Sequence, residues 1–293
     1  MTELLTGLVI SNLGKGIAVE HDNHIILCQT LRKVPTLAAG DKVKFSIVAK
    51  DQGRIESLLP RHSLLERPSK GAKTRPVAAN IDQVFIVFAN EPYCDFLLID
   101  QYLAICENRN ITPLLVYNKS DLAHSDTIEQ ELKTYLALGY PFFRVSAIQA
   151  QGLIELKQAL TDKASILAGQ SGVGKSSLTN ALIPDKELKT NTVSAITKHG
   201  RHTTTAATLY HLPDGGDLID SPGVAIFGLA GLSENQLAHG YREFQAYIDL
   251  CQFNDCRHLK DKGCAVRKAV DSKEISNIRY QRFLKLREKM PTR

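Results

Sequence analysis

A chain of 293 residues that is 43% hydrophobic can bury one large core and one or two small ones, so we expect two or three domains. No apolar stretch approaches the roughly 18 residues of a membrane-spanning helix, and the first five residues lack the basic start of a signal peptide, which argues against membrane and secreted classes. The net charge is +5, and residues 251–293 alone carry 12 Lys or Arg against 5 Asp or Glu. We therefore expect a cytoplasmic protein without membrane contacts whose basic surface binds RNA. The alternative is that the basic residues only form two solvated faces of the surface, which would have the same composition.

Residues 1–65 are predicted to form a small five-stranded β-barrel. Short alternating strands are indicated at 5–10, 16–20, 25–28 and 42–48, with turn residues between them. An OB-like, oligonucleotide-binding barrel is one option, but small barrels serve many roles. Residues 66–79, which are basic and contain Pro and Gly, are predicted to be a linker or mobile loop.

Strands and helices alternate from residue 80 to about residue 230. Strands are predicted at 82–89, 112–117, 142–146, 165–168 and 217–219, and helices at 98–108, 126–138, 152–162 and 175–182. This alternation predicts a mostly parallel sheet covered on both faces, with its ligand at the carboxyl ends of the strands. Residues 231–293 are predicted to form a helical module that ends in a basic helix from 273 to about 290.

A phosphate-binding loop follows the strand at 165–168 and matches G-x-x-x-x-G-K-[ST]. Its glycines allow backbone N–H groups to surround a β-phosphate, Lys175 can bridge β- and γ-phosphates, and the Ser176 hydroxyl can bind Mg²⁺. A plain glycine-rich turn is the alternative, but the flanking strand and helix argue against it. The loop consists of Gly169, Gln170, Ser171, Gly172, Val173, Gly174, Lys175 and Ser176, and Ser177 comes next.

The strand at 112–117 ends in an N-K-x-D element made of Asn118, Lys119, Ser120 and Asp121. The Asp121 carboxylate can accept from both N1–H and the 2-amino group of guanine, whereas adenine lacks that amino group. Asn118 can serve the O6/N7 edge of the base, and Lys119 can lie over it. A backbone N–H at Ser146 or Ala147, after the next strand, can reach O6. Taken alone, the tetrapeptide could be a polar turn after a strand. In combination with the phosphate loop, the N-K-x-D element predicts GTP and GDP as ligands.

Two further elements are typical of nucleotide switches. Asp220 and Gly223 form a D-x-x-G pattern after the strand at 217–219, where Asp220 would hold Mg²⁺ through water and the Gly223 N–H would contact the γ-phosphate. The polar segment 186–205 should be a switch loop, and one threonine of the run 203–205 would give Mg²⁺ a second hydroxyl. We favour the middle one, Thr204; a Thr-rich entry into a strand is the alternative.

The order of these motifs is unusual, because most small GTPases begin with the phosphate loop and end with N-K-x-D and S-A. With a barrel before it and a cysteine-rich module after it, this circularly permuted arrangement resembles the bacterial ribosome-small-subunit-dependent GTPase family (RsgA, also called YjeQ) over essentially the whole chain. The stretches GQSGVGKSS at 169–177, GRHTTT at 200–205 and DSPGV at 220–224 carry the resemblance. It implies a GTP hydrolase that acts in late-stage maturation of the 30S ribosomal subunit, is stimulated by that subunit and contacts its rRNA. We expect a monomer.

The same resemblance implies one structural zinc ion bound by Cys251, Cys256, His258 and Cys264. The residues support this independently, because three thiolates and an imidazole within fourteen residues suit a closed tetrahedral site, and a small module with few apolar residues needs such a cross-link. The spacing C-x4-C-x-H-x5-C is not a common finger pattern, so unligated cysteines are the alternative.

The hydrolytic residue is the least determined part of the prediction. Many GTPases place a glutamine directly after D-x-x-G, but this chain has Val224 and Ala225, which cannot hold a water molecule. We hypothesise that His202 orients or deprotonates the attacking water, with Lys175 as the second catalytic group; a role of His202 at the surface or against RNA stays open. Two rival functions are an RNA-binding assembly scaffold with GTP as a structural or regulatory ligand, and a P-loop ATPase or nucleotide kinase.

Overall fold

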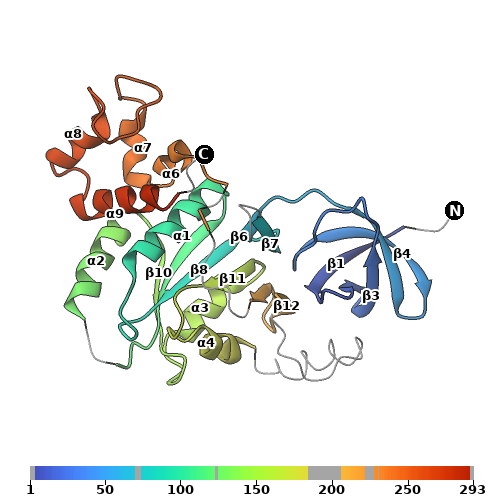
Figure 1. Ribbon diagram of the computed structural model, residues 1–293. Coiled ribbons are helices and arrows are strands. Elements are labelled where there is room, and N and C mark those ends of the chain that lie inside the picture. The colour runs from blue at the N-terminus through green and yellow to red at the C-terminus, as the bar shows by residue number, and fades with distance from the viewer. Residues whose placement is uncertain are drawn as a thin grey trace.

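The computed structural model describes residues 4–69, 74–122, 125–183, 206–221, 228–229 and 231–290. A small barrel and a helical module lie at opposite ends of a central α/β domain (Figure 1). This arrangement confirms the predicted fold class of barrel, α/β domain and C-terminal helical module. In the part of the chain that the structure describes, no helix is long and apolar enough to cross a membrane.

The barrel consists of β1 (Leu5–Asn12), β2 (Ile17–His21), β3 (His24–Thr30), β4 (Lys42–Ala49) and β5 (Gln52–Leu58). The strands neighbour one another in the order β1-β2-β3-β5-β4, and β1 also pairs with β4, which closes the barrel. Its interior is filled by fully buried side chains that include Val9, Val19, Phe45 and Ile55. The sequence predicts five strands but locates only four, because Gln, Arg, Glu and Ser make β5 mostly polar, although its residues alternate between exposed and buried over the first half of the strand.

The basic stretch after the barrel is not the predicted linker or mobile loop. Strands β6 (Leu64–Pro68) and β7 (Thr74–Ala79) pair as an antiparallel two-stranded sheet. Leu65 and Ala78 are buried in the core of the central domain, which explains why β6 and β7 form here. Pro76 lies within β7, two residues before Ala78, through which the β7 edge bridges to Ala39 of the barrel. Proline is tolerated in edge strands of this kind. The barrel strands end at Leu58 and Leu65 packs in the central core, so the predicted barrel limit of residue 65 is too long; the limits 80–230 and 231–293 stay a proposal.

The central domain is built on a six-stranded sheet with the order β10-β9-β8-β11-β13-β12. Its strands are β8 (Gln83–Phe88), β9 (Thr112–Tyr117), β10 (Phe142–Arg144), β11 (Ala164–Ala168), β12 (Thr208–His211) and β13 (Asp217–Asp220). Every pairing is parallel except that of β12 with β13, which is antiparallel. The predicted parallel sheet is therefore confirmed, with β12 as a strand that the sequence did not reveal.

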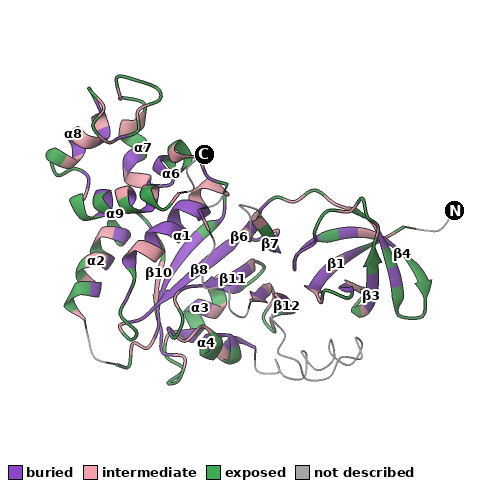
Figure 2. Cartoon of the chain, in the orientation of Figure 1, coloured by how far each residue is buried: buried purple, intermediate pink, exposed green. Residues whose placement is uncertain are grey.

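Two separate cores cover the two faces of this sheet. Helices α1 (Phe96–Asn108) and α2 (Asp126–Ala137) pack with Ile86 and Ile166 on one face. Helices α3 (Leu153–Leu160) and α4 (Lys175–Leu182) pack with Phe85 and Val87 on the other. Neighbouring residues of β8 thus belong to opposite cores, and all six of its residues are buried (Figure 2).

The C-terminal module contains α6 (Glu234–His239), α7 (Arg242–Ile248), α8 (Ala265–Asp271) and α9 (Asn277–Glu288). The predicted basic helix from 273 begins instead at Asn277, because the Ser276 side chain accepts from the Arg279 N–H and caps it. Phe244 and Phe283 belong to the same core as α1, so the module packs on the α1 side of the sheet.

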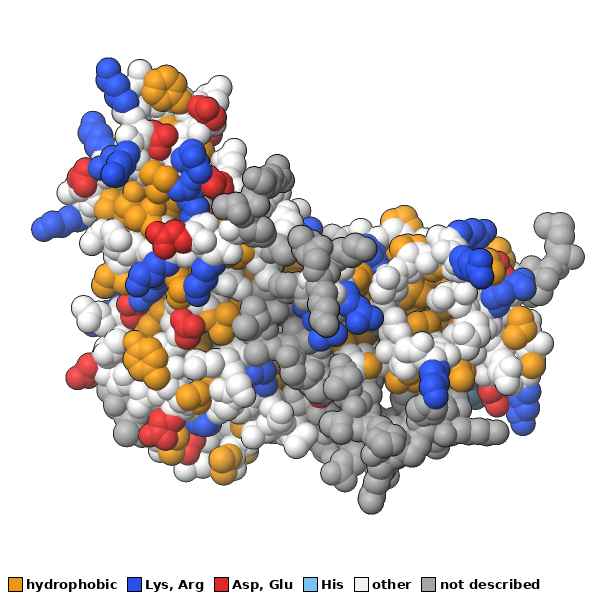
Figure 3. All heavy atoms as spheres, in the orientation of Figure 1, with side chains coloured by type: hydrophobic (Ala, Val, Ile, Leu, Met, Phe, Trp, Pro, Cys, Tyr) orange, Lys and Arg blue, Asp and Glu red, His pale blue; other side chains and the backbone are white. Residues whose placement is uncertain are grey.

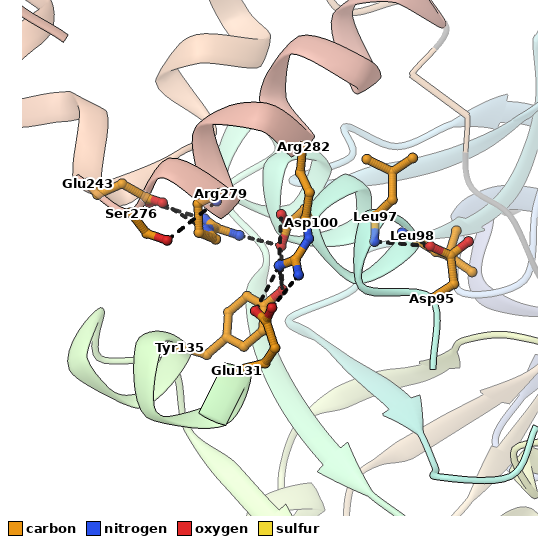
Figure 4. Close-up of polar contacts among 10 residues, drawn as sticks. All are labelled: Asp95, Leu97, Leu98, Asp100, Glu131, Tyr135, Glu243, Ser276, Arg279 and Arg282. Atoms are coloured by element: carbon orange, nitrogen blue, oxygen red, sulfur yellow. Dashed lines mark hydrogen bonds and ion pairs between the residues drawn. The ribbon is translucent and has the colours of Figure 1, made fainter. Parts of the chain in front are cut away.

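A buried ionic cluster joins this module to the central domain (Figure 4). The Arg279 guanidinium on α9 is 1% exposed; it donates to Asp100 on α1 and, at 2.7 Å, to Glu243 on α7. Tyr135 on α2 also donates to Asp100, at 2.5 Å, and Arg282 pairs with Glu131 on α2. The cluster thus connects both central-domain helices of this face to the C-terminal module.

Replacing Arg279 by Met is expected to lower the free energy of unfolding by about 3–5 kcal/mol. It would leave the buried Glu243 carboxylate without its cation, and it would leave Asp100 with only the longer pair to Arg282, at 3.9 Å. The matched control is Arg257→Met, which removes another bidentate arginine–carboxylate pair, to Glu234, at the exposed surface. Urea unfolding followed by circular dichroism measures the free energy of unfolding of both variants, since the chain contains no tryptophan whose fluorescence could be used. Equal, small effects of the two substitutions would contradict the buried role of Arg279.

Candidate nucleotide-binding site and metal centre

The predicted nucleotide motifs meet at one edge of the central sheet. The phosphate loop follows β11, the N-K-x-D element follows β9, Ser146 and Ala147 follow β10, and Asp220 is the last residue of β13. Since these strands are parallel, their carboxyl ends lie together although the motifs are far apart in sequence. The structure therefore assembles one site from four separate segments.

The phosphate loop has the backbone that its glycines predict. Gly169, Gly172 and Gly174 have φ angles of 144°, 82° and 91°, a region that side chains with Cβ rarely adopt. A Cβ on Gly169 would also lie 2.1 Å from the Val87 carbonyl oxygen of β8. The loop is thus held close against the central strand, and it leads directly into α4 at Lys175.

The side chain of Lys175 folds back onto the start of this loop. Its Nζ donates to the carbonyl oxygens of Gly169 and Gln170, at 2.7 Å each. Burial lowers the pKa of Lys175, and the carboxylate of Asp220 partly opposes this shift. The ammonium group therefore lies against the carbonyl oxygens of the loop and within the electrostatic influence of the D-x-x-G aspartate, where it can meet a phosphate chain.

The buried Asn118 side chain links the base-recognition elements to the phosphate loop. Its Nδ2 donates to the Val173 carbonyl oxygen at 2.9 Å, and its Oδ1 accepts from the Ala147 N–H at 3.2 Å. One amide thus fixes the phosphate loop and the S-A element relative to each other. Asp121, three residues later, is exposed and available to a ligand.

Gly174→Ala is expected to abolish nucleotide binding. The new Cβ would lie 2.3 Å from the Asn118 Nδ2, so the amide that joins loop and base site would be displaced. The matched control is Gly14→Ala in the barrel, where φ is +78° and no heavy atom lies within 4 Å of the new Cβ. Both variants carry backbone strain of about 1–2 kcal/mol. Fluorescent-GDP titration should show a loss of at least about 100-fold only in Gly174→Ala; comparable affinities would contradict the clash.

Sequence reasoning missed the loop after β8, which also borders the site. Lys119 has a φ of 60°, and its Nζ donates to the Glu91 carbonyl oxygen at 2.9 Å. At its other end this loop reaches the phosphate loop, because the Asp95 N–H donates to Gln170 Oε1 at 3.4 Å. No motif marks residues 89–95; only the adjacency of β8 to β11 and β9 brings them here.

The remaining switch predictions lie outside the described residues. These are the hypothesised catalytic His202, the favoured Mg²⁺ ligand Thr204 with its neighbours in the run 203–205, and Gly223 with Val224 and Ala225. The described flank of this region is Asp220, whose partner in the β12–β13 register is Thr208.

A second site lies in the C-terminal module, where the four predicted ligands come together. The ligand atoms of Cys251, Cys256, His258 and Cys264 all lie within 4.8 Å of one another. His258 Nδ1 is 3.7 Å from the Cys251 Sγ and 3.6 Å from the Cys264 Sγ. A tetrahedral ion with bonds of about 2.3 Å to sulfur and about 2.0–2.1 Å to nitrogen requires almost this separation.

The chemistry of the donors also fits a metal ion. Burial raises the pKa of Cys256 to about 12, so a thiolate there needs a nearby cation. His258 is 2% exposed with a φ of 56°, and its backbone carbonyl accepts from the Tyr280 hydroxyl on α9 at 2.7 Å. The backbone thus turns the Nδ1 toward the sulfurs. We conclude that these four residues form a metal site.

Comparison with known proteins identifies the chain's relatives. Residues 58–230 match the family model RsgA GTPase. The Small ribosomal subunit biogenesis GTPase RsgA of Hahella chejuensis is 42% identical over 97% of this chain and 84% of its own length. The protein of the same name from Chromohalobacter salexigens is 43% identical over 98% of this chain and 86% of its own length.

Solved structures agree with this likeness. YjeQ from Thermotoga maritima is 31% identical, covers 99% of this chain and 100% of its own, and superposes with a TM-score of 0.79. YloQ, a circularly permuted GTPase, is 27% identical, covers 99% of this chain and 98% of its own, and has a TM-score of 0.74. Motif order, fold and sequence therefore lead to one conclusion: this chain belongs to the RsgA GTPase family and is a GTP hydrolase with circularly permuted motifs.

Proposed function

We propose that this GTPase serves as a late-stage maturation factor of the small ribosomal subunit and that the 30S subunit stimulates its hydrolysis of GTP to GDP and phosphate. The observation that carries the proposal is the likeness to small ribosomal subunit biogenesis GTPases over 97% of the chain, which includes the barrel and the metal-binding module as well as the GTPase domain. If the likeness were limited to the GTPase domain, it would support GTP hydrolysis alone and not a role in ribosome biogenesis.

The nucleotide would be bound by the residues already brought together at the sheet edge. Backbone N–H groups of residues 169–176 would surround the β-phosphate, and Lys175 would release its two carbonyl partners to bridge β- and γ-phosphates. Ser176, Thr204 and Asp220 would hold Mg²⁺, which when bound offsets charge on the phosphate oxygens. Gly223 would contact the γ-phosphate, and Asp121 would select guanine.

Guanine selection argues against a P-loop ATPase or nucleotide kinase, since adenine would leave the Asp121 carboxylate without its two donors. A competition experiment tests this directly. Excess ATP should leave fluorescent GDP bound, whereas equal GTP should displace it. Displacement by both nucleotides at similar concentrations would favour the rival function.

For hydrolysis we retain His202 as the candidate that orients or deprotonates the attacking water, because residues 224 and 225 are Val and Ala. Intrinsic turnover should then be slow. The variant His202→Ala is expected to bind GTP normally and to lose 30S-stimulated turnover by about 100-fold or more. Full stimulated turnover in this variant would assign the water-positioning role to another group.

We further propose that the metal is one structural zinc ion held by Cys251, Cys256, His258 and Cys264. Three sulfurs and one imidazole form a closed set of four ligands with no position left for a substrate, which is typical of structural zinc rather than catalytic zinc. The site lies between α7 and α8, in a segment that has no regular secondary structure among residues 249–264.

We propose that the barrel and the basic C-terminal module form the surface that contacts rRNA. The protein would act in the cytoplasm, as a monomer. Figure 3 shows Lys and Arg side chains spread over the module among hydrophobic and acidic ones. Such a distribution suits phosphate contacts that orient the protein rather than read a sequence.

Because α1 packs on both α6 and α9, nucleotide state could be passed from the sheet edge to the module. GTP is expected to tighten binding to the small subunit and hydrolysis to loosen it. Co-sedimentation of the full chain with purified 30S subunits, in GDP and in a non-hydrolysable GTP analogue, tests this switch. Equal affinity in the two nucleotides would contradict it.

A further inference from the structure

The barrel and the GTPase sheet are joined at one strand, β12. Ser11 of β1 is the register partner of Thr208 of β12. The Ser11 Oγ donates to the Ala207 carbonyl oxygen at 2.9 Å and accepts from the Thr208 Oγ1 at 3.2 Å. Ser11 is 0% exposed and Thr208 8%, so this hydroxyl pair is shielded from water. The barrel therefore fixes the first residues of β12 by direct hydrogen bonds.

The fixed residues are next to the switch elements. Thr208 is the register partner of Asp220 in β13, so Ser11, Thr208 and Asp220 lie in line across three neighbouring strands. In sequence, Thr208 follows Thr204 by four residues. Both proposed Mg²⁺ ligands outside the phosphate loop are thus attached to β12, one through the chain and one through strand pairing.

A second contact ties the far end of β12 to the barrel. His211 Nε2 lies 2.7 Å from the Glu20 Oε2 of β2, and its Nδ1 lies 2.6 Å from the Asp217 Oδ1 of β13. The hydrogen bond with Asp217, helped by Glu20, raises the pKa of His211 to about 9. The imidazolium is charged at neutral pH and bridges barrel, β12 and β13.

Apolar packing also joins the barrel to the central domain at this place. Ile10 and Ala18 of the barrel belong to the same core as Leu209 and Ile219 of the GTPase sheet. At Gly40 of the barrel, an added Cβ would lie 2.2 Å from the Ala79 carbonyl oxygen. Close-packed contacts of this kind transmit displacement instead of absorbing it.

We propose that Ser11 and Glu20 are positioning residues for GTP hydrolysis, which hold β12 and thereby the D-x-x-G aspartate, Asp220, in its competent position. Docking of the barrel on the small subunit would reach the nucleotide site through this joint, which lies at the opposite end of the central domain from the zinc module (Figure 1). The inference rests on the proposed function, because it gives a structural route for stimulation by the 30S subunit.

The test uses the full chain with Ser11→Ala, Glu20→Gln and the double substitution. Turnover of GTP is measured with and without saturating 30S subunits, together with GDP affinity, 30S affinity and the melting temperature. The matched controls are Ser46→Ala and Glu56→Gln, which remove a hydrogen-bonded Ser–Glu pair of the barrel, on β4 and β5, that does not touch β12. The double variant is expected to lose about 5- to 10-fold in stimulated kcat, with KM for GTP and GDP affinity within about twofold of the parent.

Each outcome has a distinct meaning. If the parent protein is not stimulated by 30S subunits, the proposed function itself fails. If the parent is stimulated and the double variant is stimulated equally, the joint does not position the switch and this inference is overturned. It is also overturned if stimulation falls only in step with the melting temperature or with 30S affinity, because that pattern would reflect a purely structural role. Glu20→Gln, whose side chain lies near the surface, keeps the test valid should Ser11→Ala fail to fold.

Discussion

Asp121→Asn is expected to weaken GTP binding by about 100- to 1000-fold and to create binding of xanthosine triphosphate. A carboxylate accepts from N1–H and from the 2-amino group of guanine, and each such charge-assisted bond contributes about 1.5–3 kcal/mol. An asparagine amide keeps the acceptor for N1–H but turns a donor toward the 2-amino group. Xanthine has a carbonyl oxygen at that position, so its pattern matches the amide.

Competition against fluorescent GDP measures the affinities of the variant for GTP and for xanthosine triphosphate on one sample. The control is Asp126→Asn, another exposed aspartate, which lies in the first turn of α2 and should leave GTP binding unchanged. The gain of xanthosine triphosphate binding separates lost recognition from lost folding. Tight GTP binding by Asp121→Asn, or loss of both nucleotides, would contradict the assigned role of Asp121.

Removal of the metal is expected to unfold the segment between α7 and α8 while the GTPase domain still binds GDP. Apart from the four ligands, the contacts of residues 249–264 include the Gln252 N–H donated to the Gly263 carbonyl oxygen, the Tyr280 hydroxyl donated to the His258 carbonyl oxygen, and the surface pair of Arg257 with Glu234 on α6. Structural zinc sites contribute about 10–16 kcal/mol of apparent binding energy in isolated fingers, so the loop cannot keep its form without the ion. The buried ionic cluster of Arg279 lies elsewhere and would still hold α9 on α1.

Cys256→Ala should reduce the metal content from one ion per chain to none, as measured by mass spectrometry of the purified protein. Cys28→Ala, which removes a buried thiol of the barrel, is the matched control and should keep one ion. Amide hydrogen exchange should accelerate by about 100-fold or more over residues 249–264 of Cys256→Ala. An unchanged metal content, or unchanged exchange after metal loss, would contradict the role of the cluster.

Local chemistry made part of this molecule predictable. Helix α4 and the phosphate loop were located because Gly169, Gly172 and Gly174 need positive φ and because Lys175 begins the helix. The metal ligands were located because Cys and His donors recur within fourteen residues. In each of these cases the decisive residues are close in sequence.

The parts that escaped prediction depend on partners far away in the chain. Strand β12 has only four residues and is stabilised by pairing with β13 and with Ser11, 197 positions from Thr208. Strands β6 and β7 contain Pro, which favours a loop, but their apolar residues find a partner in the central core. The cluster of Asp100 and Arg279 spans 179 positions, and no local pattern reveals it.

The most direct test of the account is the rate of GTP hydrolysis by the full chain with and without purified 30S subunits. We expect slow intrinsic turnover and stimulation by at least about 10-fold, because no water-positioning residue follows the D-x-x-G motif and the competent arrangement depends on the partner. Equal rates in the presence and absence of 30S subunits would contradict it, and would favour a scaffold in which GTP is a structural ligand.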